Sequence, residues 1–198
     1  MKKTFLKTGL FLLVCAFAGT AVADILEAAN SLYREGRYRQ ALEIYLHPEF
    51  STDAAVQNRI GTLYLEPSLR DEIKSAEWFK KSAGQGNRYA QFNLGLAYKN
   101  GTGVKRDYAR AMQLFRQSAK GGYAPAMTAI GALYEEGKDV EKSADDAIKW
   151  YTRAADKGDA KAMHRLAEIF RYGIPGQPAD SAKAQEWKTK AEATGKKP

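Results

Sequence analysis

The sequence predicts an all-α solenoid built from stacked helix pairs. From residue 54 onward, one set of aliphatic, small and aromatic residues recurs every 34 to 36 residues, and a second set in register with it recurs every 36 or 37 residues. The chain has 198 residues, of which 44% are hydrophobic and 27% charged, a composition that excludes a disordered polar chain. A unit of about 36 residues cannot cover its own apolar face, so neighbouring units must stack.

Residues 1–23 have the three-part pattern of a secretory signal peptide. Three lysines precede an apolar stretch over residues 10–19, and Ala21-Val22-Ala23 supplies the small residues of a cleavage site, so the mature chain is predicted to begin at Asp24. The apolar stretch is too short to cross a bilayer as a helix, and no later stretch reaches that length. The segment also holds the only cysteine, Cys15, so the exported chain must be stable without disulfides.

The net charge of +8 does not indicate a nucleic-acid-binding protein. Three of the positive charges belong to the predicted signal peptide, and the others are spread over helix faces that carry both signs, such as 74–81 and 106–116. Such faces are typical of solvated surface rather than of a basic stripe that follows a phosphate backbone. No nucleic-acid partner is therefore predicted.

The first helix of each unit is marked by three columns of residues. An aliphatic residue is followed directly by a small one, which lets the second helix approach closely, and three residues later by an aromatic one. In the second unit, apolar residues at spacings of three and four line one helical face. The columns are Ile60, Leu94, Ile130 and Leu166; Gly61, Gly95, Gly131 and Ala167; and Tyr64, Tyr98, Tyr134 and Phe170.

The second helix begins at a polar capping residue and ends at a glycine. Short oxygen-bearing side chains accept hydrogen bonds from the free amides of a first turn, and Ser143 with Asp146 has the capping-box pattern. A glycine can end a helix in the left-handed conformation. The starts are Asp71, Asp107, Ser143 and Asp180; the ends are Gly86, Gly122, Gly158 and Gly195.

A column of large apolar residues, Trp78, Leu114, Trp150 and Trp187, lies seven positions after these capping residues. We expect this column to fill the core between helices, so that Trp150→Ala costs about 3–5 kcal/mol of stability. Between the two helices, Gly101-Thr102-Gly103 and Gly137-Lys138 supply turns.

These columns resemble the Sel1-like repeat (SLR), a relative of the tetratricopeptide repeat (TPR). The match is strongest from Ala90 to Gly122 and over residues 124–158, and it places four repeats at about 53–87, 88–123, 124–159 and 160–195. The first repeat departs from the pattern with Pro67 in its turn and Ser75 in place of alanine. The fourth departs with Ala167 and an unusual Gly173-Ile-Pro-Gly-Gln-Pro turn. Residues 24–52 resemble a plain TPR helix pair.

The resemblance implies a right-handed superhelix whose concave surface, lined by the first helices, binds a protein or peptide. It further implies an exported adaptor or scaffold in a cell-envelope assembly of the polysaccharide-secretion or motility type. The periplasm is the favoured location, while full secretion and the oligomeric state stay open. The groove positions carried over from the TPR are Asn30, Arg34, Asn58, Thr62, Glu66, Phe92, Leu96, Lys99, Asn100, Thr128, Glu135, Glu136, His164, Glu168 and Arg171.

The residues do not favour an enzyme or a cofactor. His47 and His164 are the only histidines, and with no cysteine after the signal segment they cannot build a zinc cluster. Glu135 and Glu136 are adjacent, so on a helix they point about 100° apart and do not form an acid–base pair. Gly101-Thr102-Gly103 follows a helix and lacks the third glycine of a phosphate-binding loop. Two alternatives stay open: a protein that binds or hydrolyses peptidoglycan, and a secreted factor that acts on a host.

Overall fold

The computed structural model describes residues 21–195, which fold as ten α-helices with no strand in that range beyond an isolated bridge between Ile174 and Gln177. Residues 1–20 of the predicted signal peptide lie outside the described residues, and α2 begins at Ala21. No helix in the described range is long and apolar enough to cross a membrane. The helices are α2 (Ala21–Arg34), α3 (Tyr38–Tyr45), α4 (Ala54–Leu63), α5 (Glu72–Gly84), α6 (Arg88–Asn100), α7 (Tyr108–Lys120), α8 (Ala124–Glu136), α9 (Ala144–Ala155), α10 (Ala160–Tyr172) and α11 (Ser181–Ala193).

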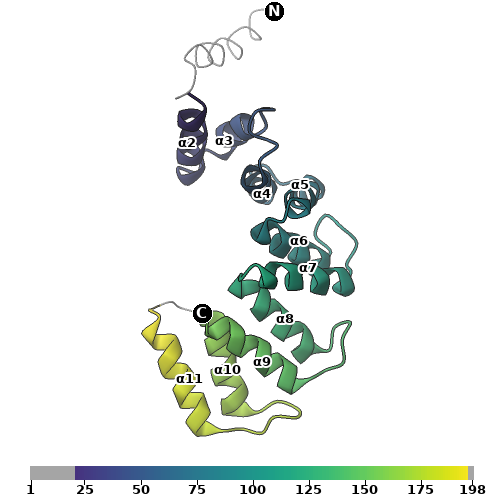
Figure 1. Ribbon diagram of the computed structural model, residues 1–198, viewed down its shortest axis with the longest axis vertical. Coiled ribbons are helices and arrows are strands. Elements are labelled where there is room, and N and C mark those ends of the chain that lie inside the picture. The colour runs from purple at the N-terminus through teal and green to yellow at the C-terminus, as the bar shows by residue number, and fades with distance from the viewer. Residues whose placement is uncertain (1–20, 196–198) are drawn as a thin grey trace, which may run out of the picture.

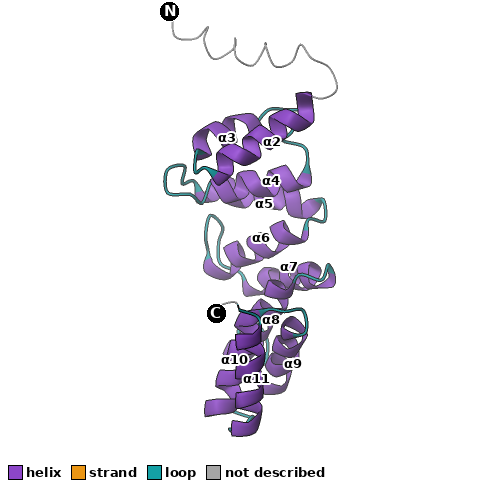
Figure 2. Cartoon of the chain, turned by 90° about the vertical axis from the view of Figure 1, so that its left-hand side faces the viewer, coloured by secondary structure: helices purple, strands orange, loops and turns teal. Residues whose placement is uncertain are grey.

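The helices stack in chain order into an elongated, curved solenoid, which confirms the predicted fold class (Figure 1). Each even-numbered helix packs against the odd-numbered helix that follows it, and that helix packs against the next pair. The helix direction turns along the stack: α4 and α5 are seen nearly end-on in Figure 1, whereas α10 and α11 run along the length of the molecule. The view turned by 90° shows the same rotation from α4 to α10 (Figure 2). We call α2, α4, α6, α8 and α10 the first helices, and the side that carries the candidate groove residues the first-helix face.

The predicted capping residues begin the second helices. The side chains of Asp71, Asp107 and Asp180 each accept a hydrogen bond from the amide three residues later, and Ser143 Oγ accepts one from the Asp146 amide and donates to the Asp146 carboxylate. The predicted capping box is only half formed, because the Asp146 carboxylate does not accept from the Ser143 backbone N–H. In all four repeats the N–H of this capping residue also donates to the carbonyl of the aromatic column on the first helix. The donor–acceptor distances are 2.9 Å for Asp71–Tyr64, 2.9 Å for Asp107–Tyr98, 3.1 Å for Ser143–Tyr134 and 2.6 Å for Asp180–Phe170.

The small-residue column allows the close helix approach that the sequence predicts. A Cβ built on Gly61, Gly95 or Gly131 would lie 2.6 to 2.8 Å from the ring of an aromatic residue on the second helix. These aromatic residues are Phe79, Phe115 and Tyr151. In the fourth repeat the aromatic residue is replaced by Lys188, and there the small residue is alanine, Ala167. The glycine is therefore required where a ring packs against the helix backbone.

The predicted core position of the tryptophan column is wrong by one residue. Trp78, Trp150 and Trp187 are only half-buried, whereas Phe79 and Tyr151, the next residues along the chain, are 2% exposed. Adjacent helix positions point about 100° apart, so only one of the two can face the glycine. The tryptophans lie at the edge of the core, where their rings are covered by cations three residues later. These cations are Lys81 at 4.0 Å, Arg153 at 4.8 Å and Lys190 at 4.3 Å from the ring centroids.

Candidate functional site

The fifteen candidate residues all lie on the first helices or at their C-terminal ends, and side chains of successive first helices contact one another. Asn93 Nδ2 donates to Asn58 Oδ1 at 3.0 Å, which joins α6 to α4. Lys99 Nζ lies 3.8 Å from a Glu136 carboxylate oxygen, which joins α6 to α8. The side chains of the first-helix face therefore form one continuous strip rather than a separate patch on each repeat.

At the N-terminal end of the strip, Asn30 is held by groups from three helices. Its Oδ1 accepts from the Tyr45 hydroxyl at 2.7 Å and from the Arg59 guanidinium, and its Nδ2 donates to Glu27 at 3.2 Å. Tyr45 is fully buried, and this burial raises the pKa of its hydroxyl. The other candidate here, Arg34, is exposed and forms an ion pair of 2.5 Å with Glu27, whose pKa is lowered by hydrogen bonds from Asn30 and Arg34.

In the middle of the strip the surface is more apolar. Phe92 packs edge-on against Tyr123 with ring centroids 5.2 Å apart and against the buried Phe115 at 5.7 Å. Leu96 is half-buried and packs against the same core. These two candidates are part of the packing between repeats and present only one side to solvent.

The strongest polar network is centred on Glu135, near the C-terminal end of α8. Its carboxylate accepts from Tyr151 Oη at 2.9 Å, from Arg165 Nε at 3.0 Å and from a second Arg165 nitrogen. Arg165 Nη1 also donates to Glu168 at 2.7 Å. Burial disfavours the ionised carboxylate, but the hydrogen bonds from Arg165 and Tyr151 outweigh it and hold the pKa of Glu135 below its ordinary value.

Several of the remaining candidates make contacts within their own helix. Thr62 and Thr128 donate to the carbonyls of Asn58 and Ala124, one turn earlier on the same helix. The Arg171 guanidinium lies 5.2 Å from the ring centroid of the exposed Tyr172. Asn100 is exposed, and Glu66 and His164 are half-buried.

Sequence reasoning missed the partners that organise this strip: Arg59, Asn93, Arg165, Tyr45 and Tyr151. Arg59, Asn93 and Arg165 share one repeat position, directly before the buried aliphatic column. A signal was present, because polar residues recur at this position in three of the four repeats. The carried-over groove positions Asn58, Phe92 and His164 directly precede these residues and point about 100° away from them on the helix.

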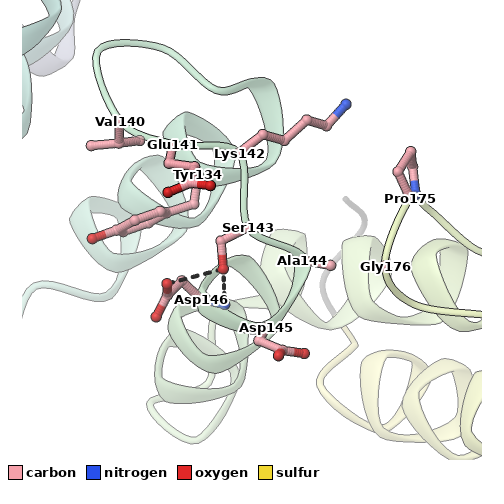
Figure 3. A pocket seen from close by; sticks show the side chains of 10 residues that line it. All are labelled: Tyr134, Val140, Glu141, Lys142, Ser143, Ala144, Asp145, Asp146, Pro175 and Gly176. Atoms are coloured by element: carbon pink, nitrogen blue, oxygen red, sulfur yellow. Dashed lines mark hydrogen bonds between the residues drawn. The ribbon is translucent and has the colours of Figure 1, made fainter.

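The arrangement offers binding groups rather than a reactive centre. Among residues 21–195, no three His, Cys, Asp or Glu side chains are placed to hold a metal ion. An open cavity of about 640 Å³ lies between the loop before α9 and the turn that contains Pro175 and Gly176 (Figure 3). Its polar groups Ser143 and Asp146 bond to each other as the cap of α9, so they serve the helix.

Comparison with known proteins agrees with this geometry. A solved Sel1 repeat protein from Oxalobacter formigenes is 34% identical, with a TM-score of 0.79 over 86% of this chain and 70% of that one. The protective antigen c5321 of uropathogenic Escherichia coli, which displays an SLR fold, is 29% identical with a TM-score of 0.73. That match covers 86% of this chain but only 38% of the antigen.

A putative Sel1 repeat protein from Klebsiella pneumoniae is 17% identical and shares the fold, with a TM-score of 0.58 over 86% of each chain. Comparison with curated proteins gave no significant match. The family model of the Sel1 repeat matches four consecutive segments, 54–87, 88–123, 124–159 and 160–193, which together make up more than half of the chain. This chain therefore belongs to the Sel1 repeat family.

Proposed function

We propose that this protein is an exported, periplasmic adaptor that binds a protein or peptide partner along the first-helix face, within a cell-envelope assembly of the polysaccharide-secretion or motility type. The observation that supports binding is the continuous strip of side chains on successive first helices. Because many of its polar groups are held by neighbours such as Arg165 and Asn93, they are oriented before a partner arrives. Preorganised groups lose less entropy on binding than free ones.

The chemistry of the strip favours an extended or helical segment of a protein. Its middle carries the apolar Phe92 and Leu96, and both of its ends carry acidic and basic side chains. A peptide with apolar anchors between polar groups of both signs matches this order of groups. Residues 24–52 are part of the same proposal, as a TPR-like pair that extends the strip by one unit.

The location rests on the sequence pattern of residues 1–23. Cell fractionation followed by N-terminal sequencing tests it. Recovery of the chain in the periplasm with Asp24 as its first residue would support export. A cytoplasmic chain that retains residues 1–23 would contradict it, and recovery from the culture medium would indicate full secretion.

A photo-crosslinking experiment in the native envelope tests the binding face. A crosslinking amino acid replaces the exposed Asn100 or Glu136 on the first-helix face, and the matched control carries it at Glu77, which is exposed on α5. We expect a discrete protein adduct from the first two sites and none from the third. Equal labelling at all three sites would contradict a specific face, and adducts with peptidoglycan instead of protein would favour a cell-wall-binding role.

A further inference from the structure

A basic groove with an apolar floor lies between α7 and α9, two second helices. It consists of two adjoining cavities of about 480 and 520 Å³, which share Arg116 and Lys120 in their lining. In the stack α8 lies between α7 and α9, and it contributes Met127 to the lining (Figure 1). The floor is formed by Met112, Ala119, Met127 and the half-buried Trp150.

Four exposed cations surround this floor: Arg116 and Lys120 from α7, and Arg153 and Lys157 at the end of α9. None of the ion pairs formed within residues 21–195 involves any of the four. Arg116 donates to the Tyr134 hydroxyl at 3.2 Å, and the Arg153 guanidinium lies over the Trp150 ring. The lining contributes only Asp139 and Asp156 as opposing charges.

These four cations differ from those in the first turns of the second helices, although in the described part of the chain Lys80 and Lys81 of α5 also form no ion pair. Lys74, Arg110 and Lys183 each form an ion pair with the capping aspartate of their own helix. In the groove, four cations share a lining with only two carboxylates, Asp139 and Asp156, and form an ion pair with neither. A surface of this kind is stabilised when a ligand supplies the missing negative charge.

The groove is specific to one place in the stack. One repeat earlier, the four cation positions hold Lys80, Gly84, Gln117 and Gly121, and the tryptophan position holds Leu114. One repeat later, the cation positions hold Thr152, Asp156, Lys190 and Thr194. The four cations around Trp150 are therefore particular to this junction and do not recur with the repeat pattern.

We infer that the α7–α9 groove is a second interaction surface, which binds an acidic segment of a protein that carries an apolar side chain. The apolar side chain enters the floor beside Trp150 and Met127, while carboxylates on either side pair with Arg153 and Lys120. Arginine can bind such carboxylates through two hydrogen bonds. The apolar groups are recessed below the cations, so they fit a protruding side chain and are poorly placed to insert into a flat anionic membrane.

This inference goes beyond binding at the first-helix face. A chain with two such surfaces can hold two partners at once, which raises the local concentration of each for the other. The four groove cations lie outside the first helices, so a variant that changes their charge leaves the side chains of the first-helix face in place.

Fluorescence anisotropy with a labelled synthetic peptide, in which glutamates flank two leucines, tests the proposal on the full chain. The groove variant is Lys120→Glu with Lys157→Glu. The matched control, Lys80→Glu with Lys161→Glu, makes the same change in net charge at exposed lysines outside the groove. We expect the groove variant to weaken binding about tenfold or more and the control less than about threefold, with unchanged circular dichroism for both.

Two companion probes separate the sources of negative charge. A peptide of glutamates without leucines should bind at least about tenfold more weakly than the leucine-containing peptide, because it cannot fill the apolar floor. Equal binding of the two peptides, or equal loss in groove and control variants, would overturn the proposal in favour of unspecific attraction. Binding to anionic phosphatidylglycerol vesicles with none to the peptide would overturn it in favour of a membrane surface.

Discussion

The first and third repeats share one backbone design but hold their helices together with different chemistry. In the first repeat two buried serines of α5 donate to carbonyls of α4: Ser75 Oγ to Gly61 at 2.8 Å and Ser82 Oγ to Ala54 at 2.6 Å. In the third repeat the same positions are the buried alanines Ala147 and Ala154.

The aromatic residues that face the glycine column differ in the same way. Phe79 of the first repeat has no hydroxyl, and its contact with Gly61 is purely apolar. Tyr151 of the third repeat packs against Gly131 and also donates to Glu135, which binds Arg165 of the fourth repeat. The buried serine hydroxyls of the first repeat thus join the two helices of a single pair. The buried Tyr151 hydroxyl of the third repeat instead supports Glu135, which binds the next pair through Arg165.

The apolar core also differs between the two halves of the molecule. One continuous cluster of buried apolar residues runs from α7 to α11, while α2 to α4 form a separate cluster and α5 with α6 form a third, smaller one. In a solenoid each unit contacts only its neighbours, so stability depends on these junctions. The C-terminal repeats are expected to unfold as a larger cooperative block than the N-terminal ones.

The largest expected effect is loss of the buried ring. Tyr151→Ala and Phe79→Ala each remove a nearly fully buried aromatic side chain and should cost about 3–5 kcal/mol, with Tyr151→Ala the more costly because Glu135 also loses a donor. Trp150→Ala, at the residue directly before Tyr151, should reduce the free energy of unfolding by less than half as much, because Trp150 is half-buried. Urea unfolding of the three variants measures the difference. If Trp150→Ala proved as destabilising as Tyr151→Ala, the tryptophan column would belong to the core after all.

The second effect is steric. Gly131→Leu should cost about 3 kcal/mol, because even its Cβ would lie 2.8 Å from the Tyr151 ring, and the hydrogen bond to Glu135 holds that ring in place. Ala167→Leu is the control, since the fourth repeat has Lys188 instead of a ring. Thermal unfolding should show a large shift for the first variant and a small one for the second. Equal shifts would mean that the glycine column has a backbone role rather than a packing role.

The repeat register made most of the fold predictable from sequence, and it also limits what sequence can show. Residues such as Ile130 and Gly131 recur because the same contact recurs, so their columns could be found by spacing alone. The same spacing cannot decide whether Trp150 or Tyr151 faces inward, because both positions recur with period 36. Packing against the glycine decides it, and that contact appears only in three dimensions.

The candidate site was less predictable because its organising residues recur in position, as Arg59, Asn93 and Arg165 do, while their chemistry and their partners change. Glu135 and Arg165 are 30 residues apart, and no other repeat has the same acidic and basic pair at these two positions. Arg59 reaches Asn30 in a helix pair of different type, and Asn93 meets Asn58 through neutral amides. A different polar pair joins the repeats at each junction. Alignment of the repeats therefore does not reveal these contacts.

The third prediction concerns the charged link between the third and fourth repeats, whereas the first repeat joins the second through the neutral amides of Asn58 and Asn93. Glu135→Gln should cost about 1.5 kcal/mol at neutral pH, a modest value because the Arg165 side chain is 39% exposed and solvent screens the pair. The folded-state pKa of Glu135 is lowered, so its contribution is present above the ordinary carboxyl pKa of about 4.3 and is lost as the pH falls through the lower folded value. The stability difference between parent and variant should therefore shrink below about pH 4.

Glu136→Gln is the matched control for this prediction. Its carboxylate is exposed and lies 3.8 Å from Lys99, so the change should cost less than about 0.5 kcal/mol. Urea unfolding of both variants at neutral and acidic pH measures the two effects. A pH-independent loss for Glu135→Gln would show that the side chain acts through packing and not through its charge.

The smallest expected effect on stability comes from exchanging serine and alanine at residues 82 and 154, which are equivalent positions in the first and third repeats. Ser82→Ala removes the fully buried hydroxyl that donates to the Ala54 carbonyl, and this should cost about 1 kcal/mol. The reverse change, Ala154→Ser, should be nearly neutral if the third repeat has kept the geometry of the others. Its hydroxyl would face the carbonyl of Ala124, which corresponds to the Arg88 carbonyl that accepts from Ser118 at 2.7 Å in the second repeat.

Urea unfolding of these two variants shows whether the first and third repeats differ only in their side chains or also in how closely their two helices pack. If Ala154→Ser costs about 2 kcal/mol or more, the hydroxyl has found no acceptor and the α8–α9 pair is packed too closely to admit one. If Ala154→Ser is neutral while Ser82→Ala is destabilising, the two repeats share one geometry. Residue 154 then accepts either alanine or serine without loss of stability. The difference between the repeats would then rest on the bonds that Tyr151 and Arg165 make to Glu135.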